Sequence, residues 1–407
     1  MKSERRFFLK TLAAGASAAR YAFPANDTVS IGCIGTGGRA QVLMRNLEAV
    51  KGSRISAVCD VWDENLGKAR QIAGPQAAAA KDFRAVLDRK DIDAVLIGAP
   101  DHQHVPLAMA AMAAGKDVYV EKPLTHRLSE GPAIIQAQQN SGRIVQVGMQ
   151  QRSMPHLQKG YEIVKSGRIG KVHKVHLTWN RNQPRYQRVN YNIDPATVNW
   201  KAWLGSAPEQ KFDEYRFRQW RWFWDFGGGI FTDLMVHWID VVHWYLDLDH
   251  PAEATSVGDW FAAKGVWETP DTVQTLMRYP DREVQVYFEG TFVNARNAAM
   301  VEFMGSDGTL YIDRGRYELY PEQVKPFGEP AQPAKFAYSE WVLGKGPRGA
   351  DFYDNPNGEL LHLQAWIDAV RTRTQPNAPV PAGVSAASAA HLANQALREG
   401  KVAHYGA

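Results

Sequence analysis

A strand, a glycine-rich turn and a helix near the N-terminus limit the fold of this chain more than any other feature of its sequence. Val29–Ile34 is an apolar run typical of a buried strand, and Gly35–Ala40 follows it with the spacing G-x-G-x-x-A. Apolar residues then recur at helical spacing as far as Leu47, and a second apolar run, Ile55–Cys59, ends at Asp60. This order predicts the first βαβ unit of a parallel, doubly wound sheet.

The same segment predicts a binding site for a dinucleotide. Glycines at this spacing let the backbone approach a pyrophosphate at the helix N-terminus. An acidic residue about 20 positions further on can accept hydrogen bonds from the adenosine ribose, and Asp60 occupies that place. Because its carboxylate should repel a 2′-phosphate, we expect NAD rather than NADP as the cofactor.

Further α/β units follow, with strands expected at Ala94–Gly98, Val118–Val120 and Ile144–Gly148 and helices between them. The carboxyl ends of parallel strands form the ligand crevice of such sheets. Lys122, beside a rigid proline at one of these ends, is therefore a candidate for contact with cofactor or substrate. The residues expected to bind the cofactor are Gly35, Thr36, Gly37, Gly38, Arg39, Asp60, Pro100, His104, Glu121, Lys122 and Gln150.

The second half of the chain predicts an α+β domain, because runs of strands follow an α/β half. Pro155–Gly167 is helical in pattern and two closing helices are expected near the C-terminus, at Gly358–Val370 and Val384–Arg398. The expected strands are Lys171–Asn180, Ala254–Phe261, Thr272–Arg278, Glu283–Glu289, Met300–Gly305 and Thr309–Asp313. At 407 residues the chain exceeds one core, so we expect a dinucleotide-binding domain at residues 26–150 and a substrate and oligomerisation domain at 151–407.

A triple glycine at residues 227–229 leads into a strongly patterned helix. On an α-helix Asp233 and His237 stand at i and i+4, which would place a carboxylate and an imidazole on one face. Asp240 extends that stripe by three residues. Three consecutive glycines are costly unless the chain turns tightly or something approaches it closely, which favours a functional helix over an ordinary buried one.

The same helix also allows a metal site, since carboxylate and imidazole ligands suit zinc or iron. The candidate ligands would be Asp233, His237, Asp240 and His243. His243 lies six residues beyond His237 and hence well round the helix, so we expect no metal.

An aromatic segment, residues 191–226, precedes the glycines. A loop this long is more often functional than structureless, so we expect it to form a wall of the substrate pocket, with core packing as the rival interpretation. The candidate substrate contacts are Arg152, Trp200, Arg221 and Trp222.

Composition excludes several classes of partner. The net charge of +4 is small and the basic residues are dispersed, which argues against a nucleic-acid groove. Only two cysteines are present, Cys33 and Cys59, both in expected buried strands. After the first residues no segment reaches the ~18 uninterrupted apolar residues of a membrane span.

Residues 1–25 are expected to lie outside the fold. Glu4–Lys10 contains two adjacent arginines and precedes the short apolar run Thr11–Ala19, a pattern typical of a twin-arginine export signal. This predicts a bacterial protein that works in the periplasm or is otherwise exported. Because the space outside the cytoplasm should lack a pool of NAD, we expect the cofactor to be retained and recycled within the site.

The chain resembles the Gfo/Idh/MocA oxidoreductases, the family of glucose-fructose oxidoreductase and inositol dehydrogenase. The matching motifs are Gly35–Ala40, Glu121-Lys122-Pro123 and the Asp233 and His237 pair after the glycines, and the similarity runs from Val29 to the C-terminal helices. Ala40 stands where many members have glycine. The resemblance implies a catalytic group of Lys122, Asp233 and His237, and a second domain built on an open, mainly antiparallel sheet with helices on one face.

These observations predict an enzyme that oxidises a hydroxyl of a sugar or polyol by hydride transfer to NAD. His237 would be the general base, Asp233 would orient its ring or bind a neighbouring hydroxyl, and Lys122 would stabilise the reacting oxygen. Two alternatives remain open: a glycoside hydrolase that uses NAD transiently, and a non-catalytic NAD(H)-binding sensor. We further expect a homo-oligomer formed through the open sheet.

Overall fold

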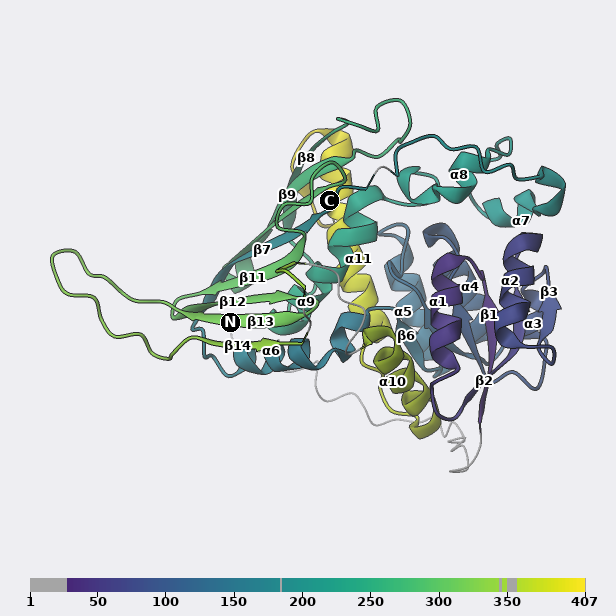
Figure 1. Ribbon diagram of the computed structural model, residues 1–407, viewed down its shortest axis with the longest axis horizontal. Coiled ribbons are helices and arrows are strands. Elements are labelled where there is room, and N and C mark those ends of the chain that lie inside the picture. The colour runs from purple at the N-terminus through teal and green to yellow at the C-terminus, as the bar shows by residue number, and fades with distance from the viewer. Residues whose placement is uncertain (1–27, 184, 344–345, 350–356, 407) are drawn as a thin grey trace, which may run out of the picture.

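The computed structural model describes residues 28–183, 185–343, 346–349 and 357–406. The export signal expected in residues 1–25 lies outside this part of the chain. Two sheets form the scaffold, one of six strands and one of nine. Figure 1 shows the N-terminal sheet with its helices on one side of the molecule and the large sheet on the other, with α9 and α11 between them.

The N-terminal sheet has the strand order β3-β2-β1-β4-β5-β6, and every pair in it is parallel. This is the doubly wound order in which the crevice forms at the carboxyl ends of β1 and β4. Its strands are β1 Val29–Ile34, β2 Ser53–Cys59, β3 Ala78–Ala80, β4 Ala94–Ile97, β5 Asp117–Val120 and β6 Val145–Val147. Its helices are α1 Gly38–Leu47, α2 Asp63–Ala73, α3 Arg84–Leu87, α4 Asp101–Ala113 and α5 Glu130–Ser141.

The second sheet has the order β14-β13-β12-β11-β7-β10-β9-β8-β15 and is antiparallel except between β7 and β10. Its strands are β7 Val172–Asn180, β8 Glu253–Asp259, β9 Thr272–Tyr279, β10 Val284–Thr291, β11 Ala299–Gly305, β12 Gly308–Asp313, β13 Arg316–Pro321, β14 Ser339–Val342 and β15 Ala403–His404. Side chains alternate between buried and exposed along β9, so one face of this sheet packs on the core and the other is open. Both sheets confirm the predicted fold class.

Helices of the C-terminal half lie against the buried face of the large sheet or beside the N-terminal domain (Figure 1). They are α6 Pro155–Lys165, α9 Val236–Leu246, α10 Gly358–Thr372 and α11 Val380–Glu399. The aromatic segment 191–226 contains short helices, chiefly α7 Trp200–Leu204 and α8 Glu214–Arg218. Short 3-10 turns occur at Gln150–Ser153, Pro195–Thr197, Trp220–Trp222 and Pro280–Arg282, and a π-helix occurs at Phe231–Met235.

Helix α11 and the strands β13, β14 and β15 of the C-terminal half differ from expectation. Helix α11 begins at Val380, four residues before the predicted start, because Pro381 sits in its first turn, where a missing N–H costs nothing. Strands β13, β14 and β15 were not predicted. In β13 three consecutive residues, Tyr317–Leu319, are buried instead of alternating, and the buried Glu318 pairs with Arg348 at 3.3 Å.

Helix α10 packs on the N-terminal domain although it comes from the far end of the chain. Trp366 is fully buried in the cluster that contains Ile31, Leu43 and Tyr119, with its ring centroid 5.5 Å from that of Tyr119. The N-terminal sheet therefore needs a C-terminal helix to cover one of its faces. Among the described helices, none is long and apolar enough to cross a membrane.

We expect Trp366→Ala to lower the free energy of unfolding by about 3–5 kcal/mol, because it removes a fully buried ring between α10 and the N-terminal sheet. The matched control is Leu361→Ala on the same helix, whose side chain is 37% exposed and which should change stability by about 0.5 kcal/mol or less. Urea unfolding measures both variants. Equal losses in the two would show that α10 is not held by this cluster.

Candidate active site

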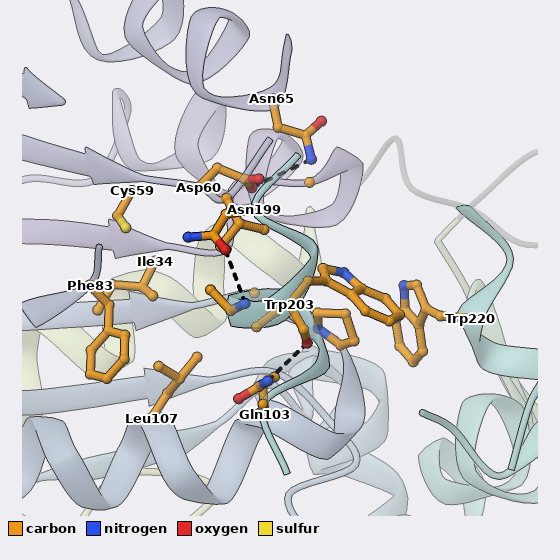
Figure 2. A pocket seen from close by; sticks show the side chains of 18 of the residues that line it. Ile34, Cys59, Asp60, Asn65, Phe83, Gln103, Leu107, Asn199, Trp203 and Trp220 are labelled. Atoms are coloured by element: carbon orange, nitrogen blue, oxygen red, sulfur yellow. Dashed lines mark hydrogen bonds between the residues drawn. The ribbon is translucent and has the colours of Figure 1, made fainter. Parts of the chain in front are cut away.

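A large cavity of about 590 Å³ lies at the carboxyl edge of the N-terminal sheet. Gly35, Gly37, Gly38 and Asp60 line one side of it. Figure 2 shows Trp203 and Trp220, from the aromatic segment, facing residues of the N-terminal sheet across the cavity. The aromatic segment was predicted to border the substrate; part of it closes over the nucleotide-binding turn instead.

The glycine turn packs closely against the residues that follow the C-terminal end of β4. Gly35 has φ +72°, and a Cβ there would lie 2.7 Å from the Ala99 backbone. A Cβ on Gly98 would lie 2.7 Å from the Ala40 side chain, so helix α1 and the β4 end are in contact. Both glycines are required by this approach of helix to strand.

The first turn of α1 has room for an anionic group. No side chain caps this helix, and a Cβ added to Gly38 would meet no atom within 4 Å. The backbone N–H groups of a helix N-terminus favour phosphate. A pyrophosphate therefore fits the residues present, as the glycine spacing predicts.

Asp60 organises the turn as well as lining the cavity. Its Oδ2 accepts hydrogen bonds from the backbone N–H of Thr36 at 2.7 Å and from the Thr36 hydroxyl at 3.3 Å, and its Oδ1 accepts one from the Trp62 N–H at 2.9 Å. Burial raises the pKa of Asp60 to about 6, although these hydrogen bonds oppose the shift. Thr36 is fully buried and is not part of the cavity lining, so it acts through Asp60.

A second cavity of about 270 Å³ adjoins the first and shares Arg39, Gly98, Ala99, Trp220 and Arg221 with it. The second cavity brings together all three residues of the predicted catalytic group, Lys122, Asp233 and His237. His104, Glu121 and Gln150, which were predicted to bind the cofactor, also line it, whereas Pro100 lines the first cavity.

Lys122 and Asp233 are joined by two hydrogen bonds. The Lys122 Nζ donates to the Asp233 backbone carbonyl at 2.7 Å and to its Oδ1 at 3.1 Å. Asp233 lies in the π-helix Phe231–Met235, whereas His237 lies in α9. The regular α-helical geometry predicted for this pair is therefore wrong, although both side chains line the second cavity. The wider turn of a π-helix disturbs the regular hydrogen-bond ladder, and such turns are frequent at functional sites.

Arg221 is the second cation on Asp233, donating from Nε to Oδ1 at 3.0 Å. Burial alone would raise the pKa of Asp233, but the charges of Lys122, Arg221 and Arg185 outweigh it and hold that pKa well below its usual range. Asp233 is thus an ionised anchor for two cations. Within the described part of the chain Asp233 makes no hydrogen bond to His237, so Asp233 acts on the ring through its charge alone, which tends to raise the pKa of His237.

The triple glycine supports this arrangement through protein packing. A Cβ on Gly227 would lie 2.9 Å from the backbone of Arg221, and Gly229 has φ +65°. A Cβ on Gly228 would lie 2.4 Å from the Thr232 side chain. The close approach that three glycines predict is therefore made by the chain itself, just where Arg221 reaches Asp233.

His237 is a buried imidazole at the wall of the second cavity. Its ring centroid lies 5.1 Å from that of Trp179, and its Nδ1 makes no hydrogen bond within the described part of the chain. Burial, reinforced by the charges of Lys122 and Arg314, lowers the pKa of His237 well below its usual range. The neutral ring can accept a proton.

A buried network holds the wall next to the glycine turn. Arg39 donates to Glu121 at 2.9 Å and to Glu359 at 3.0 Å, which links α1, the β5 end and α10. The two ring nitrogens of His104 lie 2.6 Å from the Pro123 carbonyl and 2.8 Å from the Ala99 carbonyl. These contacts fix the loops on either side of Lys122.

Three predicted substrate residues are not part of the lining of the described cavities. Arg152 makes a bidentate ion pair with the buried Asp240, with Nη2 to Oδ1 at 2.7 Å. Trp200 stacks on Trp203 at 4.7 Å, and the fully buried Trp222 stacks on Trp267 at 4.2 Å. Both tryptophan contacts are core packing, which was the rival interpretation for these rings. Of the four predicted substrate contacts, Arg221 lies at the cavity.

The metal alternative finds no support in these positions. His243 is held between the Ser385 hydroxyl and the Tyr279 hydroxyl, each at 2.7 Å, and Asp240 is held by Arg152. Across the described ranges, no group of three or more His, Cys, Asp or Glu side chains is placed to hold a metal ion.

The candidate site residues omitted nine residues of the second cavity, and five of these are charged or aromatic and lie outside segment 191–226: Asp101, Trp179, Arg181, Arg185 and Arg314. Trp179 lies near the end of β7, and Arg314 directly follows β12. The rule that ligands gather at strand ends was applied only to the parallel sheet. The order of strands in the second sheet, which no single motif records, was needed to apply it here.

Comparison with known proteins agrees with this geometry. Residues 29–149 match the family described as "Oxidoreductase family, NAD-binding Rossmann fold", and residues 200–311 match the "GFO/IDH/MocA C-terminal domain". The chain belongs to the Gfo/Idh/MocA oxidoreductase family. The family resemblance predicted from the motifs is therefore confirmed, and the NAD-binding assignment of the first domain with it.

Relatives within the Gfo/Idh/MocA family carry several names. An inositol 2-dehydrogenase of Gluconacetobacter diazotrophicus is 31% identical over 228 residues, which is 54% of this chain and 55% of that protein. A glycosyl hydrolase family 109 protein of Solibacter usitatus is 38% identical over 124 residues, 28% of each chain. The match thus spans about half the length of the inositol 2-dehydrogenase and 28% of the length of the glycosyl hydrolase family 109 protein.

A solved structure shows the same fold over nearly the whole chain. The levoglucosan dehydrogenase in complex with NADH and levoglucosan has a TM-score of 0.72, with 17% identity, and the superposition covers 94% of this chain and 100% of that one. The likeness shows that the two chains share one fold across both domains.

We expect the His237 imidazole to titrate well below its ordinary pKa of about 6.5, because burial and nearby positive charges disfavour its protonated form. Since the unfolded chain binds this proton more readily, lowering the pH through about 6.5 favours unfolding. Histidine resonances followed by NMR against pH measure the value, and the spectrum of His237→Gln assigns the signal. Titration of that signal at or above pH 6.5 would contradict the described environment.

Proposed function

We propose that this protein is an NAD-dependent oxidoreductase that acts on a CH–OH group of a sugar or polyol. One observation carries the proposal: Lys122, Asp233 and the neutral His237 converge on a cavity that adjoins the cavity of the glycine turn. A base and a cation placed together beside a dinucleotide site suit oxidation of a hydroxyl.

His237 removes the hydroxyl proton in this mechanism. Its pKa is lowered by burial first and by Lys122 and Arg314 second, so the ring is neutral before the substrate binds. Its ring lines the cavity, and its Nδ1 makes no hydrogen bond within the described residues. When bound, NAD supplies the acceptor for the hydride of the carbinol carbon.

Lys122 stabilises negative charge on the reacting oxygen, since its ammonium group has three donors and lines the same cavity. Asp233 holds that ammonium group in place through its carbonyl and its carboxylate. Arg39, Glu121 and Gln150 also line this cavity, with Arg39 bonded to Glu121, and would position the nicotinamide half of the cofactor.

We expect Lys122→Ala and His237→Ala each to lower turnover at least about a hundredfold, because each removes a group that acts on the reacting oxygen or its proton. NAD binding should persist, since the glycine turn and Asp60 are untouched. Formation of NADH with a panel of sugars and polyols measures turnover, and fluorescence titration measures cofactor binding.

Lys159→Ala is the matched control for this pair, because Lys159 is exposed and pairs only with Glu162 on its own helix, at 2.7 Å. Its turnover should equal that of the unchanged protein. Near-normal turnover in both cavity variants would refute the assignment of the catalytic group.

A second candidate is a glycoside hydrolase that oxidises a ring carbon transiently, eliminates the aglycone and reduces the ring again. The 38% identity to the glycosyl hydrolase family 109 protein favours keeping it. The same base, cation and cofactor would serve both reactions. Release of an aglycone without net NADH would identify the hydrolase, whereas accumulation of NADH identifies the dehydrogenase.

We also propose that the protein is exported by the twin-arginine pathway and retains its nicotinamide. Support comes from Glu4–Lys10, with its adjacent arginines, and from the NAD-binding domain that follows. This pathway carries folded cargo, so cofactor loaded in the cytoplasm would remain in the site. Paired oxidation and reduction of two substrates, or a redox-neutral cleavage, would then recycle it.

Protein purified without added NAD should carry close to one equivalent of NAD and keep it through desalting. The reason is that ordered side chains lining the cavity, such as Trp203 and Trp220, slow dissociation of the cofactor. The released nucleotide is quantified after denaturation. Protein that arrives empty and binds NAD weakly and reversibly would contradict retention.

We propose that the open face of the large sheet forms a homo-oligomer. Val257 on β8 is 60% exposed and Leu276 on β9 is 42% exposed, and both strands carry apolar side chains outward. Next to them, the ring of His176 stacks on Tyr287 with centroids 5.3 Å apart. Light scattering of the intact chain measures the assembly, and a concentration-independent monomer would contradict it.

A further inference from the structure

Arg221 belongs to both cavities. It lines each of them, as does the neighbouring Trp220, and its side chain is 31% exposed. Its Nε donates to Asp233 Oδ1 at 3.0 Å, and Lys122 Nζ donates to the same oxygen at 3.1 Å. One carboxylate oxygen therefore binds a cation from the aromatic segment and a cation from the turn after β5.

The donors of Lys122 are largely taken up by Asp233. Its Nζ donates to the Asp233 backbone carbonyl at 2.7 Å as well as to Oδ1. An ammonium group has three donors, so these two bonds leave one for the oxygen of a substrate. Because the two bonds fix the ammonium group, they also fix the direction of its third donor. The position of the Asp233 carboxylate thus determines where Lys122 can act.

The backbone of Arg221 is held firmly in place. The next residue, Trp222, is fully buried and stacks on Trp267 with ring centroids 4.2 Å apart. Gly227 packs so closely that a Cβ there would lie 2.9 Å from the Arg221 backbone. The guanidinium carbon lies 4.2 Å from the centre of the Trp220 ring. Packing of this kind is what keeps a side chain directed at one partner.

The aromatic segment that carries Arg221 is itself bound to the N-terminal domain. The Asn199 N–H donates to the Val61 carbonyl at 2.8 Å. Gln103 Nε2 donates to the Trp203 carbonyl at 3.0 Å (Figure 2). All four residues line the first cavity. The segment therefore runs from the walls of the first cavity to the carboxylate in the second.

The charge of Arg221 acts on the carboxylate as well. Burial alone would raise the pKa of Asp233, and the charges of Lys122, Arg221 and Arg185 lower it. A carboxylate that faces one ammonium group cancels much of the field of that group. When the carboxylate is shared with Arg221, more of the Lys122 field is left to act on an oxygen that becomes negative during the reaction.

We propose that Arg221 is a positioning residue that holds the Asp233 carboxylate and shares its charge, so that Lys122 keeps a directed donor and its positive field for the reacting oxygen. This proposal rests on the proposed function, in which Lys122 stabilises that oxygen. The sequence predicted a substrate contact for Arg221 instead. A substrate contact changes binding, whereas a positioning role changes the step that follows binding.

Steady-state kinetics of two variants separate these roles. In Arg221→Gln we expect kcat to fall at least about thirtyfold, while KM for the best substrate of the sugar and polyol panel changes less than about threefold. Arg221→Lys keeps the charge without the planar fork and should recover at least about fivefold of the loss. An unchanged kcat in Arg221→Gln, with or without a raised KM, overturns the proposal.

The NMR signal of His237 tests the charge of Arg221 without turnover. Burial lowers the pKa of this ring, and the charged groups that act on it are Lys122, Arg314, Asp233 and Arg39. Of these, only Asp233 raises the pKa. Removing the Arg221 charge leaves the Asp233 charge less compensated, so the midpoint should rise in Arg221→Gln and stay unchanged in Arg221→Lys. An unchanged titration in Arg221→Gln, or an equal rise in both variants, overturns the shared charge.

Arg188→Gln is the matched control. Arg188 is exposed, pairs with Asp213 at 2.9 Å and lines neither cavity, so its kcat, KM and His237 signal should equal those of the unchanged protein. NAD affinity and Tm check the folding of every variant. If Arg221→Gln does not fold, Arg221→Met is measured in its place, because it removes the charge and keeps an unbranched side chain over Trp220. If the unchanged protein turns over no substrate, the proposed function fails, and the His237 signal still tests Arg221.

Discussion

The two hydrogen bonds from Lys122 to Asp233 are the contact on which the site depends. They join a turn at the end of β5 to the π-helix of the second domain, so one side chain spans the two halves of the molecule. Because Arg221 binds the same carboxylate, the aromatic segment is tied to this point as well. The ion pairs of Asp233 thus link the two domains and the aromatic segment at the cavity, and the charges of Lys122 and Asp233 add to burial in setting the pKa of His237.

The sequence alone predicts the elements that have local signatures. The glycine turn, the parallel strands and Asp60 follow from one βαβ unit, and the class of the second sheet follows from runs of alternating strands. Lys122, Asp233 and His237 could be named because two motifs and a family resemblance mark them. Their convergence on one cavity is a property of the tertiary structure, which depends on how the two sheets face each other.

The failures have physical causes of the same kind. An i, i+4 relation between Asp233 and His237 assumes an α-helix, but a π-helix intervenes, and no composition rule locates its extra residue. Arg152 and Trp222 are residue types expected in a sugar site. In the structure, however, Arg152 pairs with the buried Asp240 and Trp222 stacks on Trp267. Arg181 and Arg185 follow β7 and Arg314 follows β12, so only the fold reveals them as neighbours of one cavity.

The position of α10 has a consequence for synthesis on the ribosome. Chains emerge from the N-terminus and domains usually fold in that order. Here the first domain is covered by Leu363, Trp366 and Ile367, and its Arg39 is held by Glu359. The nascent nucleotide-binding half consequently remains unfinished, with an apolar face bare, until translation has passed the whole second sheet. We therefore expect a polypeptide that ends before α10 to expose this apolar face and to lack the Glu359 partner of Arg39.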